Sequence, residues 1–118
     1  MSKLWDEIKA AKVEKPWGYE LHWAQTDKYA GKLLFIKAGH RLSKQYHEVK
    51  EETVFVLRGV LYNYDESDEV TKFYTGDTFH VQPRQVHRFG AGEMNVELIE
   101  VSTPELEDVV RIEDDYDR

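Results

Sequence analysis

Short segments rich in β-branched and aromatic residues follow one another along most of this 118-residue chain. Glycine, proline or acidic residues separate most of these segments, and such residues favour turns. The segments expected to form strands are 19–23, 32–37, 42–47, 53–57, 60–64, 70–74, 79–81, 86–89 and 96–101. Regularly spaced short strands are typical of a β-sandwich or a β-barrel, so we expect one all-β domain.

The beginning of the chain has a different pattern. Leu4 and Ile8 lie one helical turn apart, and Ser2 can cap the N-terminus of a helix. We therefore expect a short helical extension over residues 1–12, followed by a barrel domain over residues 13–118.

The end of the chain is acidic. Residues 103–118 hold seven acidic residues and two arginines, so this tail carries −5 of the net charge of −7. Apolar residues such as Leu106, Val109 and Ile112 make the tail too apolar for a disordered segment. We expect it to lie along the barrel.

The composition also excludes several classes of partner. The chain has no cysteine, which excludes disulfides and thiolate metal ligands. Its net charge of −7 argues against a nucleic-acid partner, because binding phosphates requires a cationic face. Neither a membrane-spanning run nor a signal-peptide pattern is visible, so we expect a cytoplasmic protein with no membrane partner.

Four side chains from two separate hairpins could surround one metal ion. Gln45 and His47 share a strand face because they are two residues apart, and Glu52 opens the returning strand. His87 comes from a second hairpin. Imidazole, carboxylate and amide oxygen suit zinc, and would also accept manganese, iron, cobalt or nickel.

Spacing alone leaves an alternative open. A single histidine in a strand more often fills the core or lies at the surface than binds a metal. We assign His22, His40 and His80 to that structural class, and the clustering of Gln45, His47 and Glu52 favours metal binding without deciding it.

Two motifs resemble those of the cupin family. Residues 39–59 match the spacing of the first cupin motif, with Gln45 where the first histidine usually stands, followed by His47 and Glu52. Residues 76–87 resemble the second motif, and His87 stands at its histidine position, although Gln82 and Arg84 replace the usual proline and glycine. This resemblance implies a double-stranded β-helix, or jelly-roll, barrel with one divalent metal ion.

The resemblance extends to a subfamily. The sequences Lys-Pro-Trp-Gly at 15–18, Leu-Ser-Lys-Gln-Tyr-His at 42–47, His-Arg at 87–88 and Val-Arg-Ile-Glu-Asp-Asp-Tyr-Asp-Arg at 110–118 are similar to those of the cupin-type phosphomannose isomerases. Lys44 and Asp117 replace the leucine and glycine that are usual there. The resemblance implies a metal-dependent aldose–ketose isomerase of sugars or sugar phosphates.

An isomerase of this kind needs cations for a phosphate and a base for proton transfer. Arg41 should point toward the cavity by strand alternation, and Arg88 recurs in the resembled motif, so both are candidate substrate-binding residues. Alternation predicts that Lys44 points outward, while Arg111 could close over the cavity or pair with a neighbouring acid. The candidate bases, among which the sequence does not choose, are Glu20, Glu97, Glu100 and His80.

Two other functions stay open on the sequence: a non-catalytic cupin that binds a sugar or another metabolite, and an iron-dependent cupin oxygenase. The segment from Glu52 to Gly59 is apolar on both faces, with Val54 and Val56 on one face and Phe55 on the other. We therefore expect a second layer against the outer face, and favour a homodimer over the N-terminal helix.

Overall fold

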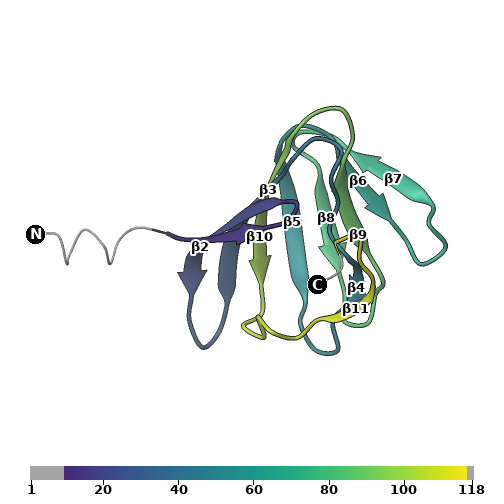
Figure 1. Ribbon diagram of the computed structural model, residues 1–118. Coiled ribbons are helices and arrows are strands. Elements are labelled where there is room, and N and C mark those ends of the chain that lie inside the picture. Colours follow the sequence, from purple (N-terminus) through teal and green to yellow (C-terminus); the bar gives the residue numbers. More distant parts are fainter. Residues whose placement is uncertain (1–9, 117–118) are drawn as a thin grey trace, which may run out of the picture.

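The computed structural model describes residues 10–116, and within that range the chain forms strands and no helix (Figure 1). The strands are β1 (Ala11–Lys15), β2 (Gly18–Gln25), β3 (Ala30–Ile36), β4 (Lys44–Tyr46), β5 (Glu52–Arg58), β6 (Leu61–Tyr64), β7 (Val70–Phe73), β8 (Thr78–Val81), β9 (Arg88–Ala91), β10 (Val96–Ser102) and β11 (Val110–Glu113).

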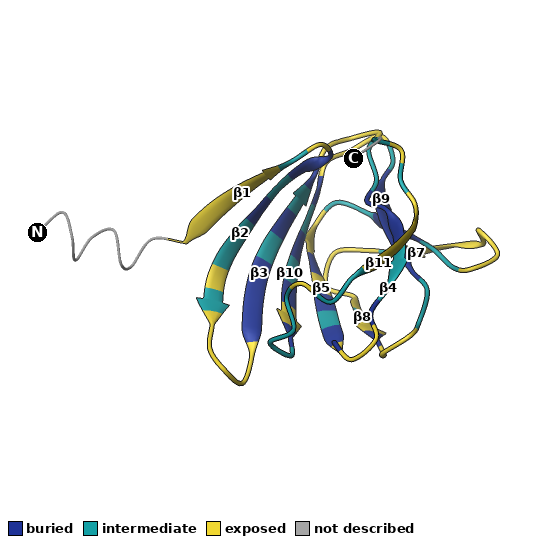
Figure 2. Cartoon of the chain, turned by 60° about the horizontal axis from the view of Figure 1, so that its bottom comes forward, coloured by how far each residue is buried: buried dark blue, intermediate teal, exposed yellow. Residues whose placement is uncertain are grey.

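The strands are arranged in three antiparallel sheets. A six-stranded sheet has the order β1-β2-β3-β10-β5-β8, a three-stranded sheet has the order β7-β6-β9, and β11 pairs with β4. Figure 2 shows β2, β3, β10 and β5 side by side, with β4, β9 and β11 lying opposite them. The all-β prediction is confirmed, although these three sheets do not form one closed hydrogen-bonded barrel within residues 10–116.

The core lies between the large sheet and the smaller ones. In β3, β5 and β10 every second side chain is buried, as expected for strands with one face against a core. Its fully buried members include Ile36, Val56, Leu61, Val96 and Leu98. Their burial removes apolar surface from water, which is the main favourable term in folding.

The strand register divides the inner face of the large sheet into two ends. At one end Leu98 of β10 lies between Leu34 of β3 and Val56 of β5, and these apolar residues belong to the core. Two residues further along β10, Glu100 lies opposite Lys32 of β3. The same face therefore changes from apolar to charged along the strands, and the charged end is where the cavity described below begins.

Each of the nine segments expected to form strands overlaps an observed strand. The prediction missed β11, which lies in the acidic tail, and β1. The helix expected over residues 1–12 falls mostly outside the described residues, but it is wrong at Ala11 and Lys12, which begin β1 and pair with β2. Hydrogen bonds to a neighbouring strand outweigh the weak local helical pattern. β1 also crosses the boundary expected between residues 12 and 13.

Across residues 10–116, no helix has the length and apolar character that a membrane span requires.

Gly18 connects β1 to β2 at a point where the backbone passes close to β3. It has φ of +155°, and a Cβ added there would overlap the carbonyl oxygen of Phe35. We expect Gly18→Ala to lower the free energy of unfolding by about 3 kcal/mol or more, the upper range for overpacking, as measured by urea denaturation.

Gly39→Ala is the matched control, because Gly39 also has positive φ, +77°, but open space around it. It should cost only about 1–2 kcal/mol, the backbone penalty of the left-handed region. Equal costs for the two variants would contradict the steric explanation.

Candidate metal centre and cavity

The prediction of two hairpins is wrong: β4 and β5 lie in different sheets, and so do β8 and β9. The segments that carry Gln45 and His87 meet because their backbones are hydrogen-bonded to each other. The amide nitrogen of Gln45 donates to the carbonyl oxygen of His87 at 3.0 Å, and the His87 amide donates back to Gln45 at 2.9 Å. His47 follows β4 by one residue, and Glu52 opens β5. A pair of backbone hydrogen bonds thus brings residues more than 30 positions apart to one site.

Three side chains converge at this site. Nε2 of His47 lies 3.2 Å from Oε1 of Glu52, and Nε2 of His87 lies 3.3 Å from the same oxygen. The potential ligand atoms of these three residues all lie within 4.8 Å of one another, and all three residues are buried. The convergence expected from the sequence is therefore present for His47, Glu52 and His87.

The opposite nitrogen of each imidazole ring binds a backbone carbonyl. Nδ1 of His47 contacts the carbonyl oxygen of Asp108 at 2.5 Å, and Nδ1 of His87 contacts that of Gln85 at 3.0 Å. A carbonyl oxygen can only accept, so Nδ1 carries the proton in both rings. Nε2 of His47 is hydrogen-bonded to Oε1 of Glu52 at 3.2 Å, so it donates there when both ring nitrogens carry a proton. In the neutral rings each Nε2 instead presents a lone pair, which is the form of histidine that binds a metal.

His87 gives the clearest indication that a cation belongs here. Its Nε2 is buried and has no hydrogen-bond partner among the described residues, because the 3.3 Å approach to Glu52 lacks hydrogen-bond alignment. A proton on this nitrogen would have no acceptor, whereas a metal ion would be bound by the lone pair. Two imidazoles and a carboxylate are a donor set that suits a divalent transition metal, so the residues fit the implied ion.

Gln45 lies in the same cavity but is not part of this contact. Its Oε1 accepts a long hydrogen bond, 3.4 Å, from Oγ of Ser43. Because Gln45 lines the cavity beside His47, its role as a fourth ligand stays a prediction.

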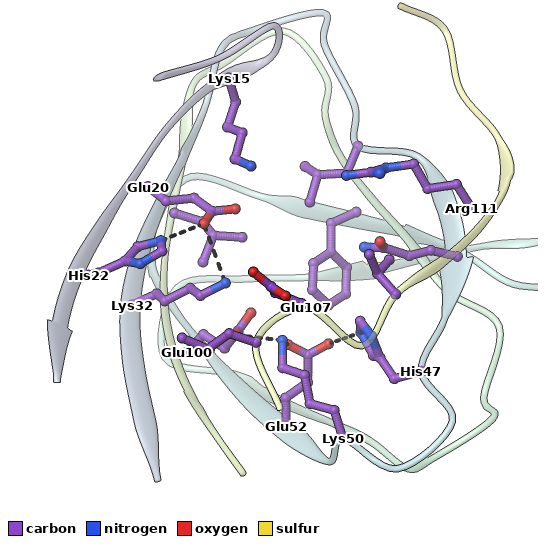
Figure 3. A pocket seen from close by; sticks show the side chains of 16 residues that line it. Lys15, Glu20, His22, Lys32, His47, Lys50, Glu52, Glu100, Glu107 and Arg111 are labelled. Carbon is purple, nitrogen blue, oxygen red and sulfur yellow. Dashed lines mark hydrogen bonds and ion pairs between the residues drawn. The ribbon is translucent and has the colours of Figure 1, made fainter. Parts of the chain in front are cut away.

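The cavity has a volume of about 300 Å³ and extends from this centre along the charged end of the large sheet (Figure 3). The charged side chains that line it are Lys15, Glu20, Lys32, Lys50, Glu52, Glu100, Glu107 and Arg111. They come from the large sheet, from the segment after β4 and from the C-terminal segment. A polar cavity of this kind suits a ligand with many hydroxyl groups better than an apolar one.

Lys50 connects the metal centre to the wall of the cavity. Its Nζ lies 3.3 Å from Glu100 and 3.7 Å from Glu52. Burial and the neighbouring Glu52 raise the pKa of Glu100 well above its ordinary value of 4.5. Burial would also raise the pKa of Glu52, but contacts with His47, His87 and Lys50 outweigh it and hold that pKa well below 4.5. Glu52 is therefore the carboxylate of the pair.

A second charged group lies further along the cavity. Oε1 of Glu20 is 2.8 Å from Nε2 of His22 and 3.3 Å from Nζ of Lys32. Burial raises the pKa of Glu20, but the charge of Lys32 and the hydrogen bond with His22 outweigh it, so this pKa lies below 4.5. Glu20 is thus a carboxylate that faces the cavity near neutral pH (Figure 3).

Asp108 in the C-terminal segment contacts both the turn between β4 and β5 and a residue of the candidate metal centre. The carboxylate of Asp108 accepts hydrogen bonds from the backbone amides of Glu48, Val49 and Lys50, at 3.0, 2.7 and 2.9 Å. The Asp108 carbonyl also contacts His47, as described above. One residue therefore shapes the turn between β4 and β5 and orients a candidate ligand.

Arg41 and Arg88 converge on Asp115 and do not line the cavity. Nε of Arg41 donates to Asp115 at 2.7 Å, and the buried Arg88 donates to Asp115 at 2.9 Å and to the carbonyl oxygen of Leu42. The prediction that Arg41 points into the cavity is wrong in this structure, because strand alternation does not hold across the short bridge that contains it. A substrate-binding role for Arg41 and Arg88 stays a prediction.

Lys44 also differs from the expectation of a surface charge. Its side chain is 6% exposed and its Nζ pairs with Asp68 at 2.8 Å. The turn between β6 and β7 covers this lysine, and the carbonyl oxygen of Glu66 in that turn accepts a further hydrogen bond from Nζ of Lys44.

Two of the four candidate bases lie outside the cavity. His80 pairs with Glu51 there.

Glu97 pairs with Arg58 and likewise does not line the cavity, which leaves Glu20 and Glu100 as the two candidate bases that do. Sequence reasoning did not identify Lys50 or Asp108. Lys50 is two residues from Glu52, and in an extended segment that spacing places both side chains on the same face. This spacing could have predicted that Lys50 lies near the site. Asp108 stands in an acidic tail and has no distinguishing local pattern.

Comparisons with known proteins agree with this architecture. A solved protein from Klebsiella pneumoniae, described as an uncharacterized conserved protein with a double-stranded β-helix domain, superposes with a TM-score of 0.71. It is 18% identical, and the match covers 92% of this chain and 88% of that one, which shows a common fold.

Two curated proteins are similar in sequence. The xanthan biosynthesis protein XanB of Xanthomonas campestris is 30% identical over 91% of this chain and 24% of its own length. A mannose-1-phosphate guanylyltransferase of Sinorhizobium fredii is 26% identical over 86% of this chain and 20% of its own length. The chain therefore spans a quarter or less of these relatives. The family model described as mannose-6-phosphate isomerase C-terminal matches residues 6–114, and the chain belongs to this family of cupin domains.

Proposed function

We propose that the chain is a metal-dependent isomerase that interconverts an aldose and a ketose, acting on a sugar or a sugar phosphate. The observation that carries this proposal is the buried, unpartnered Nε2 of His87 beside Glu52 and His47, at the end of a cavity lined by charged groups. Membership of the isomerase C-terminal family supports the same reaction class.

The candidate ligands are His47, Glu52 and His87, with Gln45 beside them. A bound divalent ion, zinc by preference or manganese, iron, cobalt or nickel, would polarise the carbonyl and hydroxyl oxygens of the sugar. The protein contributes by holding both histidines in the Nδ1–H form through the carbonyls of Asp108 and Gln85. Their lone pairs are thus oriented before any ligand arrives, which lowers the cost of binding.

Isomerisation also requires a group that moves a proton between two carbon atoms. A proton leaves carbon 2 of the aldose and arrives at carbon 1, while a second proton passes from the oxygen on carbon 2 to that on carbon 1. Glu20 is the carboxylate we assign to this task, because its low pKa keeps it ionised and it faces the cavity. Lys32 and His22 hold it in place.

Metal analysis tests the first part of the proposal. We expect purified protein reconstituted with zinc to hold one ion per chain, and His47→Ala and His87→Ala to lose it, because each substitution removes one of three ligands. The measurement is elemental analysis by mass spectrometry after desalting, with the fold checked by circular dichroism.

His80→Ala is the matched control for these two variants, since His80 lies outside the cavity and pairs with Glu51. It should keep the full metal content. Retention of metal by both ligand variants would contradict the proposed centre.

Activity tests the second part. We expect interconversion of mannose 6-phosphate and fructose 6-phosphate, or of the free sugars, in the metal-loaded protein. Glu20→Gln should reduce turnover by about 10²- to 10⁴-fold, the usual contribution of a general base, with metal content unchanged. Glu97→Gln, a carboxylate outside the cavity, should have little effect. Equal activity of Glu20→Gln and the wild type would exclude Glu20 as the base.

Non-catalytic sugar binding is the second candidate, and it is favoured by one observation. The chain spans only 20–24% of the length of its curated relatives, so a domain of this kind could bind a sugar for a reaction that another domain catalyses. Sugar binding that persists without turnover and without metal would support it. An iron-dependent oxygenase is the other alternative, and oxygen consumption by iron-loaded protein would favour it.

The homodimer also stays a prediction. It is supported by a row of apolar side chains across the outer face of the large sheet, in which Leu21, Leu33, Ile99 and Phe55 are neighbours on successive strands. Phe55 remains 40% exposed in the single chain. A second copy covering this row would remove it from water. We likewise propose a cytoplasmic location.

A further inference from the structure

The C-terminal segment crosses the cavity, but its backbone is weakly held there. β11 forms a two-stranded sheet with β4, which is three residues long, and the register between them shifts between Arg111 and Glu113. All four residues of β11 are exposed. Because two short strands alone are at best marginally stable in water, the position of this segment depends on contacts made by its side chains.

Asp108 provides the first of these contacts, at one end of the segment. Its carboxylate accepts the backbone amides of residues 48–50, and its carbonyl oxygen accepts the Nδ1 proton of His47. These partners lie 58 to 61 positions earlier in the chain. Displacement of the segment would therefore remove the acceptor that orients the His47 ring.

Asp115 provides the second contact, at the other end. Nε and a terminal nitrogen of Arg41 donate to its two oxygens at 2.7 and 3.1 Å, and Arg88 donates to it at 2.9 Å. Arg88 is 2% exposed and directly follows His87 in the chain. Such two-pronged contacts between arginine and a carboxylate are among the stronger hydrogen bonds in proteins. Asp108 and Asp115 thus hold the two ends of the segment.

The segment forms one wall of the cavity. Glu107 and Arg111 extend from it among the side chains that surround the cavity (Figure 3). The candidate ligands behind this wall are almost inaccessible, since His87 is 0% and His47 4% exposed. An ion can reach or leave such a centre only when part of the protein opens, and a segment with an exposed, short strand is the part that opens at least cost.

We propose that residues 106–116 form a strap whose docking across the cavity is coupled to metal binding. Asp108 is the positioning residue for His47, and Asp115 is the latch that holds the far end of the strap. With the strap docked, the Asp108 carbonyl keeps the proton on Nδ1 and leaves Nε2 available to the metal. Because such coupling is reciprocal, a bound ion would in turn hold the strap in place. The proposal rests on the metal centre of the proposed function but not on the isomerase reaction.

Zinc affinity, measured by competition with a chelator of known affinity, tests the first direction of this coupling. We expect Asp108→Ala to bind zinc about 10- to 100-fold more weakly, the usual effect of losing a residue that orients a ligand. Asp108→Asn keeps one oxygen that can accept amide protons, so it should lose less. Cobalt-loaded Asp108→Ala should also show an altered visible absorption spectrum, which a loss of stability alone would not produce.

Asp77→Ala is the matched control. The Asp77 carboxylate also accepts a backbone amide in a turn, that of Tyr74 at 2.8 Å, but this turn lies beside Val56 at the apolar end of β5. It should lower the free energy of unfolding and leave zinc affinity unchanged. Equal losses of zinc affinity in Asp77→Ala and Asp108→Ala would reduce the effect to general destabilisation and overturn the proposal.

The latch has its own variant. Asp115→Ala removes the acceptor shared by Arg41 and Arg88, so a chelator should withdraw zinc from it faster than from the wild type. Glu97→Gln, which removes the partner of Arg58 outside the cavity, should release zinc at the wild-type rate. Wild-type release from Asp115→Ala would overturn the role of Asp115 as a latch.

Hydrogen exchange tests the reciprocal direction. Saturating zinc should slow the exchange of backbone amides in β11 by about 10- to 100-fold, the same factor by which loss of the Asp108 contact weakens zinc binding. Amides of β7, another mostly exposed strand, should not respond. In His87→Ala, whose lost ring contacts Gln85 and not the strap, zinc should no longer slow exchange in β11.

The possible failures can be told apart. Zinc that binds the wild type but neither slows exchange in β11 nor depends on Asp108 would overturn the coupling and leave the metal centre in place. A wild type that binds no zinc would overturn both. A coupled strap in a protein that isomerises no sugar would support this proposal and contradict the isomerase.

Discussion

The convergence of two buried imidazole rings on one buried carboxylate is the constraint on which the rest of the structure depends. The backbone carbonyls of Asp108 and Gln85 accept the Nδ1 protons of the two histidines, so in the neutral rings both Nε2 lone pairs face the carboxylate of Glu52. A buried polar atom without a partner is unfavourable, and Nε2 of His87 is such an atom among the described residues. A bound cation would give it a partner, and the surrounding residues support that arrangement.

The C-terminal segment is one such support, although residues 103–118 carry −5 of the net charge of −7. Asp108 orders the turn that carries Lys50 and orients His47, while Asp115 accepts hydrogen bonds from Arg41 and Arg88. These contacts hold the segment across the cavity, so that its residues form part of the lining. The candidate metal centre, the cavity wall and the C-terminal segment therefore form one unit.

Local pattern predicted the strands well because alternation and turn residues act over a few positions. Residues 53–57 and 96–101 alternate between apolar and polar surroundings, and both segments lie within observed strands. The same reasoning failed at Ala11, where a weak local helical pattern competed with hydrogen bonds to β2. It also failed for Arg41, because alternation assumes a regular strand and that residue makes only an isolated bridge.

The sequence by itself determined the all-β class and the spacing that places Gln45, His47 and Glu52 in one short segment, since both depend on neighbours in the chain. His87 was expected at the same site, and the backbone pairing of residues 45 and 87 is what brings it there. Tertiary structure alone decided which acids face the cavity, which cations in it are paired, and how Asp108 orients a histidine. These outcomes depend on contacts between residues that are distant in sequence, and a local sequence pattern does not predict such contacts.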